Sequence, residues 1–314
     1  RKVVSAVSGV DLKEDESESA GPCFNIRQDE SLLSEERVVS ILFNSLTERA
    51  GRQFSRNDAI NLMLCFTQGY ITTFSGLPGT GKTSLCNILA GALGLLNNAS
   101  GKRFTEINVE NGWTSYKDYI GYYNPLSKTF EKSNTAVFDA MKRLSKEEDG
   151  AGDLPPYLFL LDEANLSPIE HYWSPFLRAC DSFEEVGAKL SLGGAETWSI
   201  PPYVRFVATV NFDHTTEALS HRFLDRSWVI TLDPDFPDAD LAKLNILNEF
   251  SGDSAFSSRR LLEVFGYKES DLPDTDNMQL FDDLMRVCKA NSFAVSPRSR
   301  LMMRRYIASA SRLM

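Results

Sequence analysis

The stretch Tyr70-Ile-Thr-Thr-Phe-Ser-Gly-Leu-Pro-Gly-Thr-Gly-Lys-Thr83 decides the fold. Its first half is rich in β-branched and aromatic residues and predicts a short strand. Its second half, Gly76–Thr83, matches the pattern G-x-x-x-x-G-K-[ST] at every specified position. An apolar stretch from Thr83 to Leu95 then predicts a helix. Strand, glycine loop and helix in this order predict the opening of a nucleotide-binding α/β unit.

The glycine loop predicts a phosphate site, because glycines let successive backbone N–H groups turn toward phosphate oxygens and the next helix adds its positive end. In this pattern Lys82 reaches the β- and γ-phosphates, and the Thr83 hydroxyl binds Mg²⁺. An ordinary glycine turn is the alternative, but the flanking strand and helix favour phosphate binding. The predicted cofactor-binding residues of this segment are Gly76, Pro78, Gly79, Thr80, Gly81, Lys82, Thr83 and Ser84.

Two acids follow a second apolar strand, Tyr157–Leu161. They are expected at the carboxyl edge of a parallel sheet, where ligands bind in such folds. Asp162 is the predicted metal residue together with Thr83, and Glu163 is predicted to polarise the water that attacks the γ-phosphate. A solvated acidic strand end is the alternative. The second acid indicates hydrolysis rather than storage of the nucleotide.

Four more polar residues are candidates for the same site. Asn211 closes the strand Val204–Asn211 and is predicted to bind the attacking water or the γ-phosphate, with a polar strand cap as the alternative. Arg226, and with less support Arg222, are predicted to reach the nucleotide of a neighbouring subunit. Arg298, in Ser296-Pro-Arg298, begins the last predicted helix and is expected to fold back onto the nucleotide of its own subunit. Surface salt bridges are the alternative for each arginine.

Continuous apolar strands predict a parallel sheet that helices cover on both faces. The expected organisation is an acidic tail or linker over 1–30, an α/β core over 31–235 with a hairpin around Gly193-Gly194, and a small all-α lid domain over 236–314. The first residue is Arg1, and the chain is interpreted as a piece of something longer.

Composition excludes several classes of protein. Hydrophobic residues make up 42% and charged residues 24% of 314 residues, as in ordinary globular domains. No apolar run approaches the roughly 18–20 residues of a membrane span, so no membrane partner is expected. The net charge of −10 argues against coating nucleic acid by bulk charge. Five scattered cysteines and three histidines indicate neither disulfides nor zinc, and favour the cytoplasm.

Taken together, five of these segments resemble motifs of the AAA+ ATPases and follow in the same order. Gly76–Thr83 resembles Walker A, Leu161-Asp-Glu163 resembles Walker B, and Asn211 resembles sensor 1. Arg226 resembles the arginine finger, and Ser296-Pro-Arg298 resembles sensor 2. More narrowly, two segments are similar to segments of McrB-type proteins within the MoxR/McrB clade. They are Asp162-Glu-Ala-Asn-Leu-Ser167 and Trp113-Thr-Ser-Tyr-Lys-Asp-Tyr-Ile-Gly-Tyr-Tyr123.

The resemblance implies an NTPase that works with Mg²⁺ in a homo-oligomeric ring, usually a hexamer, with active sites between subunits. It further implies a McrC-like nuclease partner, recognition of DNA through a domain absent from this chain, and restriction of foreign or modified DNA. McrB itself uses GTP and has an Asn-Thr-x-Asp pattern at sensor 1. In the corresponding segment here, Asn211-Phe-Asp-His214, the acid stands one position earlier. The nucleotide is therefore ATP or GTP, with ATP favoured.

Two other functions remain open on the sequence alone. One is a MoxR-like chaperone that remodels a protein or inserts a metal, and the other is a nucleotide-gated assembly scaffold. The aromatic run Trp113–Tyr123 adds a further choice, because it predicts either a pore that grips a polymer or ordinary domain packing.

Overall fold

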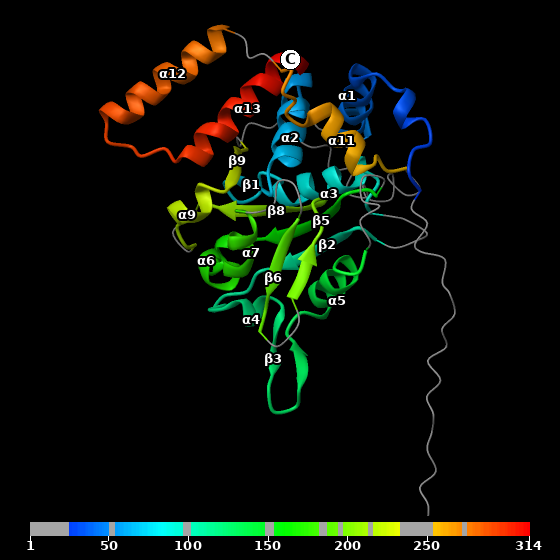
Figure 1. The fold of residues 1–314 in the computed structure, drawn as a ribbon, viewed down its shortest axis with the longest axis vertical. Helices are drawn as coiled ribbons and strands as arrows, with labels where there is room; N and C mark the ends of the chain where they lie inside the picture. The colour runs from blue at the N-terminus through cyan, green and yellow to red at the C-terminus, as the bar shows by residue number, and fades with distance from the viewer. Residues whose placement is uncertain are drawn as a thin grey trace, which may run out of the picture.

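The computed structural model describes residues 25–49, 54–96, 102–147, 154–181, 187–193, 197–212, 216–232, 254–271 and 275–314. In this part of the chain, five strands form one parallel sheet in the order β2-β5-β8-β1-β9 (Figure 1). Their bounds are β1 Ile71–Gly76, β2 Phe104–Asn108, β5 Tyr157–Asp162, β8 Val204–Asn211 and β9 Ser227–Thr231. The strand that leads into the glycine loop therefore lies between β8 and β9.

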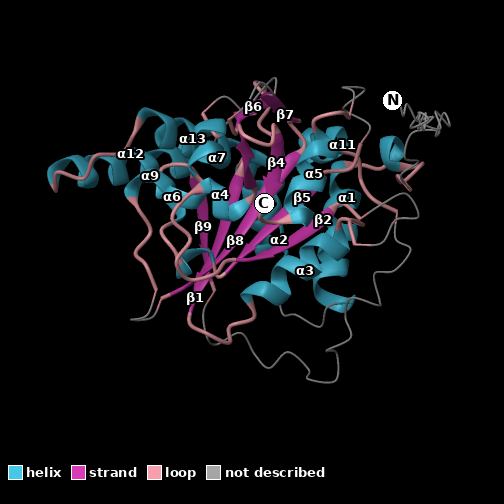
Figure 2. Ribbon diagram, turned by 90° about the horizontal axis from the view of Figure 1, so that it is seen from below, coloured by secondary structure: helices cyan, strands magenta, loops and turns pink. Residues whose placement is uncertain are grey.

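Alternate residues of the central strands enter two separate cores, which explains why these strands read as continuous apolar runs. Leu158 and Leu160 of β5 pack on one face with α1 (Glu35–Asn44), α2 (Arg56–Gln68) and α3 (Lys82–Ala92). Phe159 and Leu161 pack on the other face, against a second set of helices. That set comprises α4 (Tyr116–Tyr119), α5 (Thr135–Leu144), α6 (Ile169–Tyr172), α7 (Ser174–Ala179) and α9 (His221–Leu224). Figure 2 shows the strands running side by side between these helical layers.

Two hairpins lie beside the main sheet. The β6 (Ala188–Ser191) and β7 (Thr197–Ile200) pair is the hairpin predicted around Gly193, which has a positive φ of 87°. The β3 (Gly121–Asn124) and β4 (Thr129–Lys132) pair projects from the molecule (Figure 1) and was not predicted from the sequence. Three short irregular helices complete the described elements: η1 (Glu30–Leu32), the π-helical η2 (Ser45–Arg49) and η4 (Ala164–Leu166).

The C-terminal region is helical where the structure describes it, with α11 (Ser258–Phe265), α12 (Thr275–Ala290) and α13 (Pro297–Leu313). The first part of the expected all-α domain, residues 236–253, lies outside the described residues. Leu261 and Phe265 of α11 belong to the same core as α2, and Tyr306 of α13 packs against it. Of these three helices, only α12 extends away from the α/β core (Figure 1).

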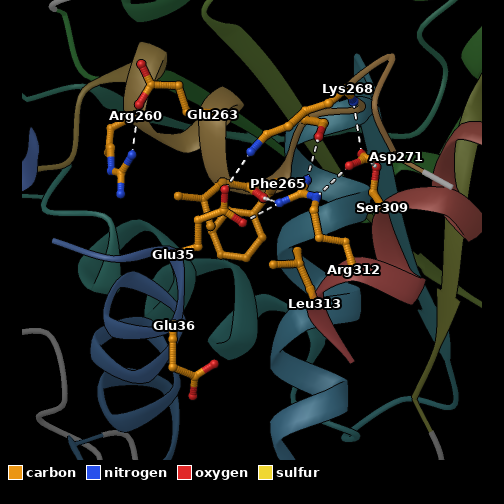
Figure 3. Close-up of polar contacts among 12 residues, drawn as sticks. Glu35, Glu36, Arg260, Glu263, Phe265, Lys268, Asp271, Ser309, Arg312 and Leu313 are labelled. Atoms are coloured by element: carbon orange, nitrogen blue, oxygen red, sulfur yellow. Dashed lines mark hydrogen bonds and ion pairs between the residues drawn. The ribbon is translucent and has the colours of Figure 1, made fainter.

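A group of ion pairs fastens the end of α13 to the start of α1 and to the segment after α11 (Figure 3). Arg312 donates to Glu35 and, at 2.7 Å, to Asp271 Oδ1, while Lys268 donates to the other oxygen of Glu35. A backbone hydrogen bond also joins the segment before η1 to this region, since Arg27 N donates to Ala255 O at 2.9 Å. The boundary expected at residue 30 therefore falls inside a segment that contacts the C-terminal region.

Candidate functional site: the carboxyl edge of the sheet

The glycine loop leaves the end of β1 with a backbone that needs its glycines. Gly79 and Gly81 have φ angles of 84° and 76°, in the left-handed region that L-residues rarely adopt. A Cβ at Gly76 would lie 2.7 Å from the main-chain oxygen of Leu232. Gly81 also caps α3, and its carbonyl accepts the first bond of that helix, from Leu85 N at 2.9 Å. The loop is thus held where the positive end of α3 points at it.

Lys82 lies inside the loop rather than in solvent. The residue is 6% exposed, and its Nζ donates to the carbonyls of Gly76 and Leu77 at 3.1 and 2.8 Å. The ammonium group is therefore already placed at the centre of the proposed phosphate site, and a bound phosphate would exchange with these two carbonyls.

The structure brings together the two residues predicted to bind the metal. Thr83 Oγ1 donates to Asp162 Oδ1 at 2.7 Å, although the residues come from different elements. A hydroxyl and a carboxylate are oxygen ligands of the kind that Mg²⁺ prefers. The donor set at this place therefore fits the ion that the sequence implies.

Thr209 of β8 completes this arrangement, and the sequence reading missed it. Its Oγ1 donates to Asp162 Oδ1 at 2.6 Å and accepts from Glu163 N at 2.8 Å. One hydroxyl thus holds both the carboxylate of Asp162, at the end of β5, and the main chain of Glu163 that follows it. The sequence contains one indication that Thr209 belongs to the site. It lies two residues before Asn211, on a strand that is expected beside the acids.

Glu163 has an unusual backbone and an exposed side chain. Its φ of 53° lies in the left-handed region, which costs a non-glycine residue about 1 kcal/mol or more. The bond from its N–H to Thr209 holds the peptide in this conformation. The strained turn leaves its carboxylate at the strand end, next to Asp162, where a water molecule can reach it.

Asn211 is positioned by Asn165, a second residue that the sequence reading left without a role. Asn165 is 3% exposed, its Nδ2 donates to Asn211 O at 2.8 Å, and its Oδ1 accepts from Asn211 N at 3.2 Å. Asn211 also pairs in register with Gly76 across β1 and β8. The segment after the two acids therefore holds the main chain of Asn211 beside Gly76, where the glycine loop begins.

A third carboxylate lies close to Asp162. Burial, and then the charge of Asp162, raise the pKa of Glu106 on β2. Nothing in the sequence pattern separates Glu106 from an ordinary exposed strand residue, so it was not predicted as part of the site.

Arg226 lies far from the glycine loop of its own chain. It directly precedes Ser227, which pairs with Ile71 at the beginning of β1, whereas the loop begins at Gly76. Five strand residues at about 3.3 Å each separate these two edges by about 17 Å along the sheet. Its guanidinium binds Asp181, with Nε to Oδ1 at 2.9 Å and Nη2 to Oδ2 at 3.1 Å. Arg222 is exposed on α9, the short helix that ends two residues before Arg226.

Arg298 does not fold back onto the nucleotide loop of its own chain as expected. Its guanidinium lies 2.9 Å from Asp181 Oδ1 and 3.6 Å from Asp225 Oδ2, beside Arg226. The reason is the docking of α13, whose Ser299 hydroxyl donates to Asp225 Oδ1 at 2.6 Å. Burial alone would raise the pKa of Asp225, but hydrogen bonds from Ser296 and Ser299 and the charges of Arg298 and Arg226 lower it.

Most of the aromatic run after β2 serves packing. Tyr119 is fully buried, and Trp113 contacts both Tyr119 and Tyr172 edge-on, with ring centroids 6.3 and 5.3 Å apart. Tyr116 OH donates to Leu192 O at 3.3 Å. Tyr122, in the β3–β4 hairpin, is the residue of this run with a clearly exposed ring, and Lys117 Nζ lies 5.4 Å from its centre.

Comparisons with known proteins support the fold. No protein-family model matches the sequence, and no curated protein is significantly similar to it. Among solved structures, a "putative ATPase" from Cytophaga hutchinsonii is similar, with a TM-score of 0.54 and 16% sequence identity. The alignment covers 88% of this chain and 80% of that chain. The predicted fold class is confirmed: a parallel α/β sheet with helices on both faces and helices after it, consistent with a P-loop NTPase.

Within the described residues, no helix is both long and apolar enough to cross a bilayer.

Proposed function

We propose that the chain is an AAA+ NTPase that hydrolyses ATP or GTP with Mg²⁺. The observation that carries the proposal is the 2.7 Å bond between Thr83 and Asp162, with Glu163 next in sequence. This contact joins the end of the glycine loop to the acids of a strand two positions away in the sheet. The arrangement combines, at one edge, the parts that phosphoryl transfer requires.

Each residue has a separate task in this mechanism. The loop amides and Lys82 would bind the β- and γ-phosphates, and Thr83 and Asp162 would hold Mg²⁺. When bound, the ion neutralises charge on the phosphate oxygens. Glu163 accepts a hydrogen bond from the attacking water and draws its proton away, and Asn211 holds that water in line with the γ-phosphate.

The arginines complete the site of a second copy. Arg226 precedes β9 at the opposite edge of the sheet, about 17 Å from the glycine loop by the register of β1 and β9, and Arg298 binds the same carboxylate, Asp181. Their charge therefore serves a nucleotide held by a neighbouring subunit, where it stabilises the transition state. A ring in which each subunit faces the next in the same orientation provides such a contact at every interface.

The proposed biological role is that of a McrB-like motor in restriction of foreign or modified DNA, together with a McrC-like nuclease subunit. The resemblance of Asp162–Ser167 to McrB-type segments supports this role, and the buried contacts of Asn165 give that segment a structural purpose. DNA recognition is assigned to a separate domain. A turnover assay with the product of the neighbouring gene added tests this role, because a nuclease partner is expected to stimulate hydrolysis.

The NTPase itself is tested by comparing ATP and GTP turnover of the wild type with that of Glu163→Gln. Loss of the general base is expected to lower turnover by about 100-fold or more while the nucleotide still binds. Glu170→Gln, a change of the same kind on α6, provides the matched control and retains turnover. Unchanged phosphate release in Glu163→Gln would instead support the scaffold function, and absence of nucleotide binding would exclude all of these functions.

A further inference from the structure

Both arginines assigned to a neighbouring nucleotide are bound to one carboxylate. Asp181, just after α7, accepts from Nε and Nη2 of Arg226 at 2.9 and 3.1 Å, and Arg298 Nη2 lies 2.9 Å from the same carboxylate. The third nitrogen of the Arg226 guanidinium has a hydrogen-bond partner as well, because Nη1 donates to Arg222 O at 2.9 Å. The Arg226 side chain is only 13% exposed, compared with 39% for Asp181. Its guanidinium is therefore enclosed.

A carboxylate bound in this bidentate way occupies the guanidinium edge that a phosphate would use. Arg226 cannot donate through Nε and Nη2 to Asp181 and to a phosphate at the same time. We propose that Asp181 is an autoinhibitory latch that holds Arg226 and Arg298 in a single subunit. The triphosphate of a neighbouring copy opens the latch by competing for the guanidiniums.

Charge explains why an opened latch favours a phosphate. In the closed state, Asp181 and Asp225 balance Arg226 and Arg298. Once Asp181 is displaced, the two guanidiniums share Asp225 alone, and one positive charge is left for the incoming phosphate. The bond from Ser299 to Asp225 keeps α13 docked meanwhile, so Arg298 stays beside Arg226.

The latch rests on the proposed function, because it presupposes that both arginines act on the nucleotide of a neighbouring copy. Its first test needs no activity. Asp181→Asn keeps the shape of the side chain and removes its charge, so phenylglyoxal should modify Arg226 about fivefold faster, as judged by peptide mass spectrometry. Arg37, exposed on α1, is the internal reference. Asp181→Glu should return the rate toward that of the wild type.

Asp139→Asn is the matched control. Asp139 pairs with Lys132 at 2.7 Å, on elements that carry neither arginine. It should leave the modification of Arg226 unchanged. Thermal melting of all variants shows whether they are folded.

Turnover then tests the regulatory role. At a low subunit concentration, Asp181→Asn is expected to hydrolyse nucleotide about fivefold faster than the wild type, because its arginines need no release. Adding Arg226→Ala to Asp181→Asn should remove this gain.

The two proposals fail in different ways. If the wild type turns over nucleotide but folded Asp181→Asn is equal or slower, the latch is wrong and the proposed function stands. If the wild type shows no turnover with ATP or GTP at any concentration, the proposed function fails and the latch with it. A modification rate of Arg226 that does not change in Asp181→Asn also overturns the latch.

Discussion

A single carboxylate oxygen, Asp162 Oδ1, receives hydrogen bonds from two threonine hydroxyls. Thr83 donates from the start of α3 and Thr209 from β8. The first hydroxyl belongs to the nucleotide loop, whereas the second only orients the acids. Residues that orient a metal ligand without binding the ion commonly change metal affinity when they are replaced.

The first prediction therefore concerns Thr209→Val. Loss of its hydroxyl frees Asp162 and removes the acceptor of Glu163 N–H, so Mg²⁺ affinity in the presence of nucleotide should fall about tenfold. The measurement is turnover as a function of Mg²⁺ concentration. Thr105→Val removes a hydroxyl that bonds Tyr157 OH on the same sheet, and it should leave this dependence unchanged. An unaltered Mg²⁺ requirement in Thr209→Val would contradict the assignment.

The second prediction concerns Asn165→Ala. Asn211 N and the carbonyls of Asn211 and Glu217 each lose a hydrogen bond to Asn165. Although Asn211 O keeps a second donor, Thr216 Oγ1 at 2.9 Å, the free energy of unfolding should fall by about 1–3 kcal/mol. Turnover should fall as well, since Asn211 is no longer held beside the loop, while nucleotide binding is retained. Denaturant unfolding and equilibrium nucleotide titration measure these effects. Weaker nucleotide binding at unchanged turnover would show that Asn165 supports the loop instead.

Among the helices and strands, the local sequence determines the position of some parts of the chain. Contacts between residues distant in sequence determine the position of the others. The strand and helix around Gly76–Thr83 could be predicted because their pattern is local, and β5 and β8 because both faces are apolar. Arg298 was misplaced because the docking of α13 depends on Asp225 and Asp181, which lie far from it in sequence. Thr209 and Asn165 could not be assigned because their roles come from contacts between elements distant in sequence: Thr209 of β8 bonds Asp162 of β5, and Asn165 of η4 bonds Asn211 of β8.

The third prediction concerns the ion pairs that join α13 to α1 (Figure 3). Burial alone would raise the pKa of Glu35, but hydrogen bonds from Lys268 and the charge of Arg312 outweigh it and lower the pKa. A carboxyl group with a lowered pKa stabilises the fold above its unfolded pKa, and this stabilisation is lost as the pH falls through the folded value. Glu35→Gln should therefore melt at a lower temperature than the wild type at pH 7.

That difference should shrink as the pH falls below the unfolded pKa of about 4.3, and it should disappear only below the lowered folded pKa, where the wild-type carboxyl is protonated as well. Thermal melting at a series of pH values measures it. Glu36→Gln is the control, because Glu36 pairs with Arg56 from a side chain that is 70% exposed. A difference of the same size at low and neutral pH would mean that packing, rather than charge, explains the effect.

At the scale of the whole molecule, the two functional edges of the sheet face different ways. The loop, Asp162 and Glu163 lie at the carboxyl edge, and Arg226 lies before the first residue of β9. Among the described residues, Arg226 therefore lies away from the nucleotide loop of its own subunit. In the proposed ring a neighbouring copy supplies this guanidinium, so activity is expected to depend on subunit concentration.

The fourth prediction uses this dependence. Glu163→Gln lacks the base but keeps its arginines, whereas Arg226→Ala lacks an arginine but keeps its base. Each should be nearly inactive by itself, and a mixture should regain turnover at interfaces where an intact Arg226 faces an intact Glu163. Steady-state turnover across mixing ratios measures this recovery. A mixture that is no more active than its components would place Arg226 outside the neighbouring site.

The length and fastening of α13 have a mechanical consequence. The helix has 17 residues and spans about 25 Å, with Arg312 anchored at one end and Arg298 at the other. Tyr306, between these two ends, packs against the core that contains α2, so the helix is held along its length and moves as one body. Arg304 of α13 contacts Asp282 and Phe281 of α12, so a shift of the Arg298 end during turnover at a neighbouring site of the proposed ring would carry α12 with it by a similar distance.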